Sequence, residues 1–200
     1  TARWLYPQPR NLEIVRPELE TKGFSRKFWI YLAAVALIAA GYADFPLIAY
    51  HFKKMSDVPD AWIPVFYSVA MGVDALAALF FGYLFDRKGI SILIFAALGS
   101  MLFAPLVFLG NFPVALAGMA LWGMGMGAQE SVMRAAIAEM VPADRRGTGY
   151  GIFNTGYGVF WFLGSATMGV LYDFSLMSLI VFSVIVQLAA VPLLLLVRKR

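Results

Sequence analysis

The fold of this chain is decided by the stretch GYLFDRKG at residues 82–89, a short charged turn between two long apolar runs. One run extends from residue 61 to residue 85, and the other from residue 90 to residue 109. Such runs can cross a bilayer as helices, because roughly 20 residues cover about 30 Å of hydrocarbon. So short a turn makes the two helices an antiparallel hairpin, and Arg87 and Lys88 predict that it lies on the cytoplasmic side.

The composition excludes a soluble domain. The 200 residues are 61% hydrophobic and only 14% charged, with a mean hydropathy of +0.75, whereas soluble domains are about 25% charged. The net charge of +4 does not indicate nucleic-acid binding, because the basic residues stand at loop ends and termini. With no cysteine and one histidine, His51, which is expected at the surface of an outer helix end, neither a metal site nor a cofactor is predicted.

The apolar runs predict an all-α membrane protein with six transmembrane helices. Residues 1–27 are polar and contain three prolines, so they are expected to form a cytoplasmic linker or tail, and residues 28–200 the transmembrane bundle. Lys53 and Lys54 are the basic residues of the expected outer loops, and this bias predicts that both termini are cytoplasmic. The expected spans are residues 28–52, 61–85, 90–109, 112–138, 148–171 and 176–197.

A short sequence motif occurs in both the second and the fifth span. Residues 82–86 and residues 169–173 both read Gly-x-Leu-aromatic-Asp, and in the predicted topology they close helices on opposite sides of the membrane. The two spans hold the same place in successive triplets of helices. The repeated motif therefore indicates a 3+3 inverted repeat.

The pattern Gly-x-x-x-Asp-Arg-x-Gly at residues 82–89 resembles the loop signature of the major facilitator superfamily, which stands between the second and third helices of each six-helix half. Glu139 and Arg146 are similar to the Glu-x6-Arg pair that follows the fourth helix of a half. The sequence departs from the signature at Ile90 and Ser91, where the family has two basic residues. The resemblance covers residues 28–200 and implies the C-terminal half of a transporter, whose partner is a missing N-terminal half or a second copy.

The resemblance also implies an inner gate, formed by charges that break contact when the helices rock apart. The alternative is that these charges only set the topology, since an exposed ion pair contributes about 0–1 kcal/mol. The predicted cytoplasmic gate residues are Gly82, Asp86, Arg87, Gly89, Glu139, Arg145 and Arg146.

Two aspartates are expected inside the membrane. Asp74 lies near the middle of the second span, where an aspartate costs roughly 2.5–3.5 kcal/mol. It is either a proton or substrate site on the cavity, or a neutral side chain packed between helices. Asp44 lies in the outer half of the first span, and Pro46 predicts an unwound segment there. Asp44 is thus a candidate outer gate or cavity residue, or an aspartate that reaches the outer interface.

Further candidates for the solute or proton path lie on the fourth and fifth spans. Glu130 and Arg134 are four residues apart, so they are predicted to pair along the helix, either in proton coupling or as a stabilising ion pair. Gln129 is expected to line the cavity beside them. The glycines of both spans are predicted to permit close helix packing or to form a hinge. The remaining candidates are three residues spaced by three and four on one face of the fifth span. They are predicted either to face the ligand or to contact another helix: Asn154, Tyr157 and Trp161.

We therefore expect secondary transport of a small solute by alternating access, in the inner membrane of a prokaryote. Coupling to protons is a hypothesis that rests on Asp44, Asp74 and Glu130. The alternative is a non-transporting scaffold or sensor built on the same bundle. An enzyme is not expected, because the sequence offers no nucleophile–base or metal constellation and no phosphate-binding loop.

Overall fold

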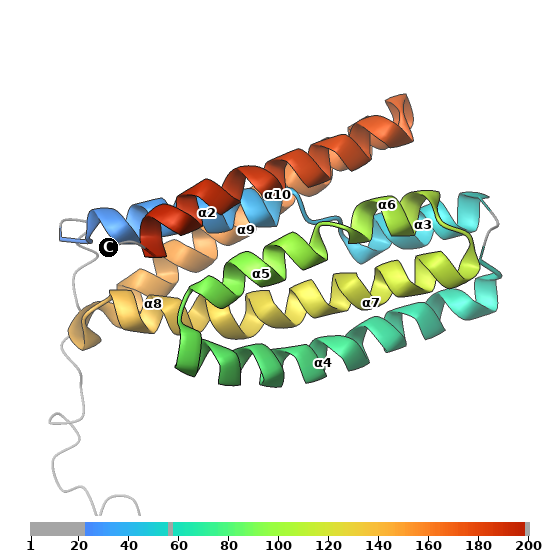
Figure 1. Ribbon diagram of the computed structural model, residues 1–200. Coiled ribbons are helices and arrows are strands. Elements are labelled where there is room, and N and C mark those ends of the chain that lie inside the picture. Colours follow the sequence, from blue (N-terminus) through green and yellow to red (C-terminus); the bar gives the residue numbers. More distant parts are fainter. Residues whose placement is uncertain (1–22, 56–57, 199–200) are drawn as a thin grey trace, which may run out of the picture.

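The computed structural model describes residues 23–55 and 58–198, and every regular element in these two ranges is a helix. Most of the predicted linker, residues 1–22, lies outside the described residues. Within the described residues the first helix is α2, which runs from Arg26 to Ala40. Its N-cap is Ser25, whose hydroxyl accepts a hydrogen bond from the Phe28 amide at 3.2 Å. The helices lie side by side along a common direction (Figure 1).

The first apolar run forms two helices rather than one. After α2 the helix is interrupted over residues 41–44, and α3 then runs from Phe45 to Met55. Pro46 is the second residue of α3, where its missing N–H would have no helical partner in any case. The unwound segment predicted around Asp44 is thus confirmed.

The second and third apolar runs are helical, as predicted from the sequence. A single turn of 3₁₀-helix, η2 (Asp60–Trp62), leads into α4 (Ile63–Lys88). The third run is divided into α5 (Ser91–Ser100) and α6 (Phe103–Leu109). Pro105 accounts for the interruption, because it has no N–H to donate to the carbonyl of Met101, four residues earlier.

The fourth and fifth runs carry the features that build the site. The fourth is α7 (Phe112–Ala128), followed without a break by a π-helical turn, η3 (Gln129–Met133), and by α8 (Arg134–Met140). A 3₁₀ turn, η4 (Ala143–Arg145), connects α8 to α9 (Arg146–Phe174). The last helix is α10 (Leu176–Arg198).

Within residues 23–55 and 58–198, four helical stretches are long and apolar enough to cross a membrane: Arg26–Met55, Asp60–Lys88, Ser91–Leu109 and Leu176–Arg198. They correspond to four of the six predicted spans. The apolar part of the fourth run, α7, is 17 residues long before the polar π turn begins. The fifth, α9, is rich in glycine and aromatic residues. That these two helices also cross the membrane stays a prediction.

Glycines bring the helices into close contact. Gly123 and Gly127 of α7 face α4, where a Cβ atom on either glycine would overlap the backbone carbonyl of Ala70 or Asp74. Gly164 of α9 lies in the same way against the backbone of Ala40 in α2. The predicted role of glycine in close helix packing is confirmed at these three positions.

The turns fall into two groups at opposite ends of the bundle (Figure 1). The start of α2, the α4–α5 turn, the η4 turn and the end of α10 lie at one end, which we call the basic end. The α3–α4, α6–α7 and α9–α10 turns lie at the other (Figure 1). This grouping is the one that the topology predicted from charge requires. The assignment of the basic end to the cytoplasm stays a prediction.

Candidate solute site

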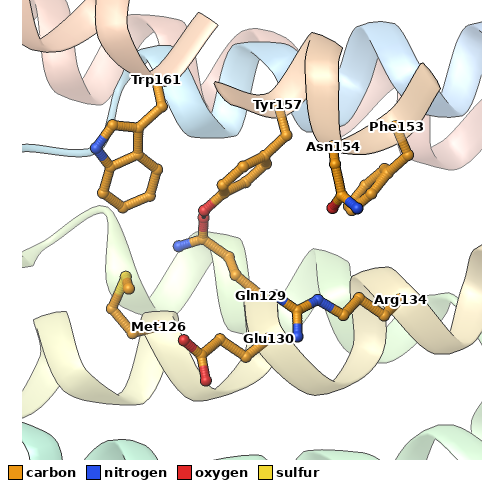
Figure 2. A pocket seen from close by; sticks show the side chains of 8 residues that line it. All are labelled: Met126, Gln129, Glu130, Arg134, Phe153, Asn154, Tyr157 and Trp161. Atoms are coloured by element: carbon orange, nitrogen blue, oxygen red, sulfur yellow. The ribbon is translucent and has the colours of Figure 1, made fainter. Parts of the chain in front are cut away.

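A pocket of about 220 Å³ lies between the π turn and α9 (Figure 2). It contains six of the eight residues that the sequence proposed for the solute or proton path. Two residues that the sequence reasoning missed, Met126 and Phe153, complete it. The lining is Met126, Gln129, Glu130, Arg134, Phe153, Asn154, Tyr157 and Trp161.

The π turn supplies the polar side of the pocket. Such a turn adds one residue to an α-helix, and it often occurs at functional sites. Gln129, its first residue, is buried, and its Oε1 accepts a hydrogen bond of 3.0 Å from the Tyr157 hydroxyl. The Gln129 Nε2 is also buried, and it has no hydrogen-bond partner within the described residues. Figure 2 shows this nitrogen turned toward the side of the pocket on which Trp161 lies, so an amide donor remains available there.

Aromatic rings on α9 form the opposite wall. Phe153, Tyr157 and Trp161 follow one another at intervals of four residues, and the ring centroids are 5.9 Å and 5.4 Å apart. Asn154 lies beside Phe153 and adds an amide to the same wall (Figure 2). The predicted stripe of Asn154, Tyr157 and Trp161 therefore does face a cavity. Phe153 could have been found by extending that stripe one turn toward the N-terminus.

Glu130 and Arg134 bring two opposite charges to the pocket. The ion pair predicted between them is not formed, because within the described residues the only ion pair within 4 Å joins Arg145 to Asp144. Both side chains are exposed at the pocket, where water competes for them and a pair would gain little. Both lie close enough to the Tyr157 hydroxyl to act on it electrostatically. The pocket thus offers a separate anion and cation.

Asp44 does not line the pocket but holds one of its walls. Its carboxylate accepts hydrogen bonds from the Trp161 indole N–H and from the Ser165 hydroxyl, both on α9. A carboxylate that accepts from two donors orients both of them. The ring of Trp161 is therefore fixed by the unwound segment between α2 and α3. Ser165 is a third residue that the sequence reasoning missed, and it lies four residues after Trp161 on the same face.

The unwound segment is braced from two further helices. The Gly41 carbonyl accepts hydrogen bonds from the Ser183 hydroxyl at 2.6 Å and from the Gln187 amide at 3.1 Å, both on α10. On the other side, the Trp122 indole of α7 donates to the Ala43 carbonyl at 2.9 Å. Backbone groups freed by a break in an apolar environment need such partners. Together with the contacts of Asp44, they fix the break from α7, α9 and α10.

Asp74 lies outside the pocket. Asp74 is half-buried on α4, and its Oδ1 is buried without a hydrogen-bond partner within the described residues. Glu130 lies near enough to act on the Asp74 carboxylate electrostatically, and Asp74 acts in turn on Tyr42 in the unwound segment. The structure thus brings Asp74 close to the charged side of the pocket without placing it on the surface of the pocket.

The residues predicted to form the cytoplasmic gate gather at the basic end without forming the expected network. Arg87 lies over the Tyr83 ring at 4.3 Å, and Arg146 donates to the Ala138 carbonyl at 3.0 Å. Asp86 and Glu139 are exposed, and in the described part of the chain neither forms an ion pair within 4 Å. The inner gate therefore stays a prediction.

Two glycines of the loop signature have different roles. Gly89 ends α4 with a φ of 60°, a left-handed conformation that favours glycine. Gly82 faces Ser131 of the π turn, and a Cβ atom there would make an ordinary van der Waals contact at 3.9 Å. The signature thus gives a sharp turn after α4 in this structure.

His51 corrects one expectation from the sequence. It is only 3% exposed, and its Nδ1 lies 3.0 Å from the Tyr172 hydroxyl. The surface position expected for it is wrong, because α3 is amphipathic and turns His51 toward α9 and Phe108 rather than toward water. No group of three His, Cys, Asp or Glu residues within the described ranges could hold a metal ion.

The comparisons with known proteins identify the family. The sequence pattern of the Major Facilitator Superfamily matches residues 28–200. The uncharacterized protein Rv2265 of Mycobacterium tuberculosis and the uncharacterized protein Mb2288 of Mycobacterium bovis are each 33% identical to this chain over 172 residues. That match covers 86% of this chain but 42% of each relative, so the chain spans about two-fifths of the length of these relatives. With the family pattern matched over all the helices described above, the chain belongs to the Major Facilitator Superfamily.

Proposed function

We propose that the pocket between the π turn and α9 is one wall of the solute path of a secondary transporter. Membership of the superfamily supports membrane transport of a small solute. The observation that supports this location is the convergence of three features on one pocket: a buried amide donor without a partner among the described residues, two separate opposite charges, and an aromatic wall. Pockets of this kind, apolar with a few fixed polar groups, are the usual sites for small ligands.

The lining suggests the chemistry of the solute. Glu130 can accept hydrogen bonds, Arg134 can donate them, and Asn154 can do both. Tyr157 and Trp161 offer flat apolar surface beside these groups. A small solute that carries both polar groups and an apolar portion would match this combination, and the Gln129 amide would add one more donor to it.

The remaining wall of the solute path would come from outside this chain. Glu130, Asn154 and Arg134 are exposed at the pocket, and the chain spans about two-fifths of the length of its relatives, 42% of each. A second six-helix half, or a second copy of this chain, would cover these side chains. Rocking of the two halves about the solute would then expose it to one side of the membrane at a time.

Transport is tested by uptake into vesicles that contain the intact protein. A mixture of amino acids, sugars, nucleosides and organic cations is offered outside the vesicles, and their contents are identified by mass spectrometry. We expect Glu130→Gln and Asn154→Ala to lower uptake of the accumulated solute at least tenfold. Asp173→Asn, which neutralises an exposed carboxylate at the far end of α9, should change it less than twofold. Unchanged uptake in both pocket variants would show that the pocket is not the solute path.

Proton coupling is a second part of the proposal. Asp74 and Glu130 lie within electrostatic reach of one another, and one oxygen of Asp74 is buried without a partner in the described residues. Two carboxylates so placed can share a proton during transport. We expect uptake to depend on pH, and Asp74→Asn to flatten this dependence while the variant still binds the solute. Wild-type uptake that does not vary with pH would contradict the coupling but not the transport.

The alternative, a scaffold or sensor without transport, makes the opposite prediction. Under it, Asp74→Asn and Glu130→Gln leave function intact, whereas changes at the closely packed Gly164 disrupt assembly. No solute would accumulate in the vesicles above the level found with protein-free vesicles. The same set of variants therefore separates the two functions.

A further inference from the structure

A second cavity, of about 580 Å³, opens at the basic end of the bundle. Parts of the chain that lie far apart in sequence meet around it: the start of α2, the α4–α5 turn, α8 and the end of α10. It shares no lining residue with the solute pocket. Its function is therefore a separate question from that of transport.

The side chains around this cavity give it a positive balance. Lys27, Lys88 and Arg198 border it, and Glu139 is the one carboxylate in the lining. Within residues 23–55 and 58–198, none of the three cations belongs to an ion pair within 4 Å. Lys27 is also partly buried. Three cations around one carboxylate leave a net positive charge at the cavity, which an anion bound there would neutralise.

The backbone adds little net attraction for an anion. The helices α2 and α5 begin at the cavity, and a helix start favours negative charge. The helices α4, α8 and α10 end there, with the opposite dipole. The three cations therefore account for the attraction, and the hydroxyls of Ser25 and Ser91 can donate hydrogen bonds beside them.

The lining of the cavity also includes apolar side chains. Ile90, Met140 and Val197 belong to it, and they also form or pack against the core of the bundle. Trp29, which is 43% exposed, stands one turn into α2 at the same end, as interfacial tryptophans do. A free phosphate needs only the cations. A phospholipid needs both the cations and an apolar surface beneath them.

We propose that this cavity binds the phosphate group of an anionic phospholipid in the leaflet at the basic end. Its glycerol backbone would rest on Ile90, Met140 and Val197. Basic pockets between transmembrane helices are suited to such headgroups. The proposal depends on insertion of the bundle in a membrane, but it does not depend on the solute or on proton coupling.

The first test compares two triple variants, each of which removes three positive charges. The purified protein is stripped of lipid in detergent, and binding of phosphatidylglycerol, phosphatidylcholine or inorganic phosphate is followed by native mass spectrometry. We expect the wild type to retain phosphatidylglycerol, and the lining triple variant Lys27→Gln/Lys88→Gln/Arg198→Gln to bind it at least tenfold more weakly. The control triple Arg26→Gln/Lys53→Gln/Lys54→Gln removes three cations that do not line the cavity and should bind within twofold of the wild type.

The second test is a single variant that should not damage the fold. Ser91→Asp places a carboxylate in the cavity at the first residue of α5, where an acidic side chain stabilises a helix. We expect the melting temperature to stay the same or rise while phosphatidylglycerol binding falls at least tenfold. This variant decides the question if the lining triple variant does not fold.

Four results would overturn the proposal. The first is equal weakening by the lining and control triples, which would indicate diffuse attraction to the net charge. The second is binding of phosphatidylcholine as tight as that of phosphatidylglycerol. The third is retention of inorganic phosphate with no preference for the lipid, which would identify a site for a free anion instead. Undiminished lipid binding in Ser91→Asp would have the same consequence.

Discussion

Asp44 illustrates how one side chain can hold a broken helix to its neighbour. It is the last residue of the break at residues 41–44, and it receives hydrogen bonds from Trp161 and Ser165 of α9. Its charge makes these bonds stronger than those of a neutral acceptor. The same bonds orient the Trp161 ring at the solute pocket. Asp44 is therefore a positioning residue whose removal should affect stability first.

We predict that Asp44→Ala lowers the free energy of unfolding by about 1–3 kcal/mol, because it leaves two donors without their acceptor. Asp44→Asn should cost less, since it keeps one acceptor oxygen. Thermal unfolding in detergent provides the measurement, with Asp173→Ala as an exposed carboxylate for comparison. A double-mutant cycle with Ser165→Ala should show a coupling of at least about 0.5 kcal/mol. Strict additivity would indicate that the Asp44–Ser165 bond contributes nothing.

At the scale of the helices, glycine determines how closely pairs of helices pack. Gly123 and Gly127 hold α7 against α4, and Gly164 holds α9 against α2. Lipid gives no hydrophobic driving force between helices, so close backbone contact and interhelical hydrogen bonds provide their attraction. The aromatic wall of the solute pocket is carried by α9, and its position therefore depends on Gly164.

Two glycines of α9 make a matched pair for a test of this packing. Gly164→Ala should destabilise the bundle by about 1–3 kcal/mol, since the added methyl group would overlap the Ala40 backbone. Gly158→Ala meets no atom within 4 Å, so it should be neutral or stabilising by up to about 1 kcal/mol. The comparison is made by thermal unfolding of the two variants in the same detergent. Equal effects of the two substitutions would contradict the packing described for Gly164.

Much of this element structure could be predicted from the sequence, since apolar runs and prolines are local signals. The break near Asp44 and the facing of Asn154, Tyr157 and Trp161 follow from proline chemistry and helical period. The π turn at Gln129 has no such local signal. It depends on contacts such as the hydrogen bond from Tyr157, which is 28 residues away in sequence. The burial of His51 likewise depends on α9, which supplies Tyr172.

The Glu130–Arg134 pair shows a further limit of local reasoning. A spacing of four residues predicts that two side chains can meet on a helix, but it does not predict what else competes for them. In the structure both side chains are exposed at a pocket, and no ion pair within 4 Å joins them. The spacing of four residues brings both charges to the same pocket, but the ion pair predicted between them is not formed.

For the whole molecule, the outer surface is as informative as the core. Leu79 of α4, Phe162 of α9 and Phe174 at the end of α9 are 75%, 70% and 82% exposed. Exposed apolar side chains of this size are found in continuous patches only where lipid or another protein covers them. The surface therefore agrees with a bundle that lies in a bilayer.

The orientation of the molecule can be measured directly, because the 200 residues contain no cysteine. We predict that a cysteine at Asp144, in the η4 turn, reacts with a membrane-impermeant maleimide only after the cells are permeabilised. A cysteine at Asn111, in the α6–α7 turn, should react in intact cells. Both positions are exposed at opposite ends of the bundle. Reaction of both from the same side would contradict the proposed topology.

The hydrogen bonds from α10 to the Gly41 carbonyl also have a consequence for biosynthesis. Its two partners, Ser183 and Gln187, lie 142 and 146 residues further along the chain. A ribosome therefore completes nearly the entire bundle before that carbonyl meets its final donors. Until then the nascent first helix pair has to find temporary hydrogen-bond donors at the translocon or in trapped water, and its mature shape is reached only when the last helix arrives.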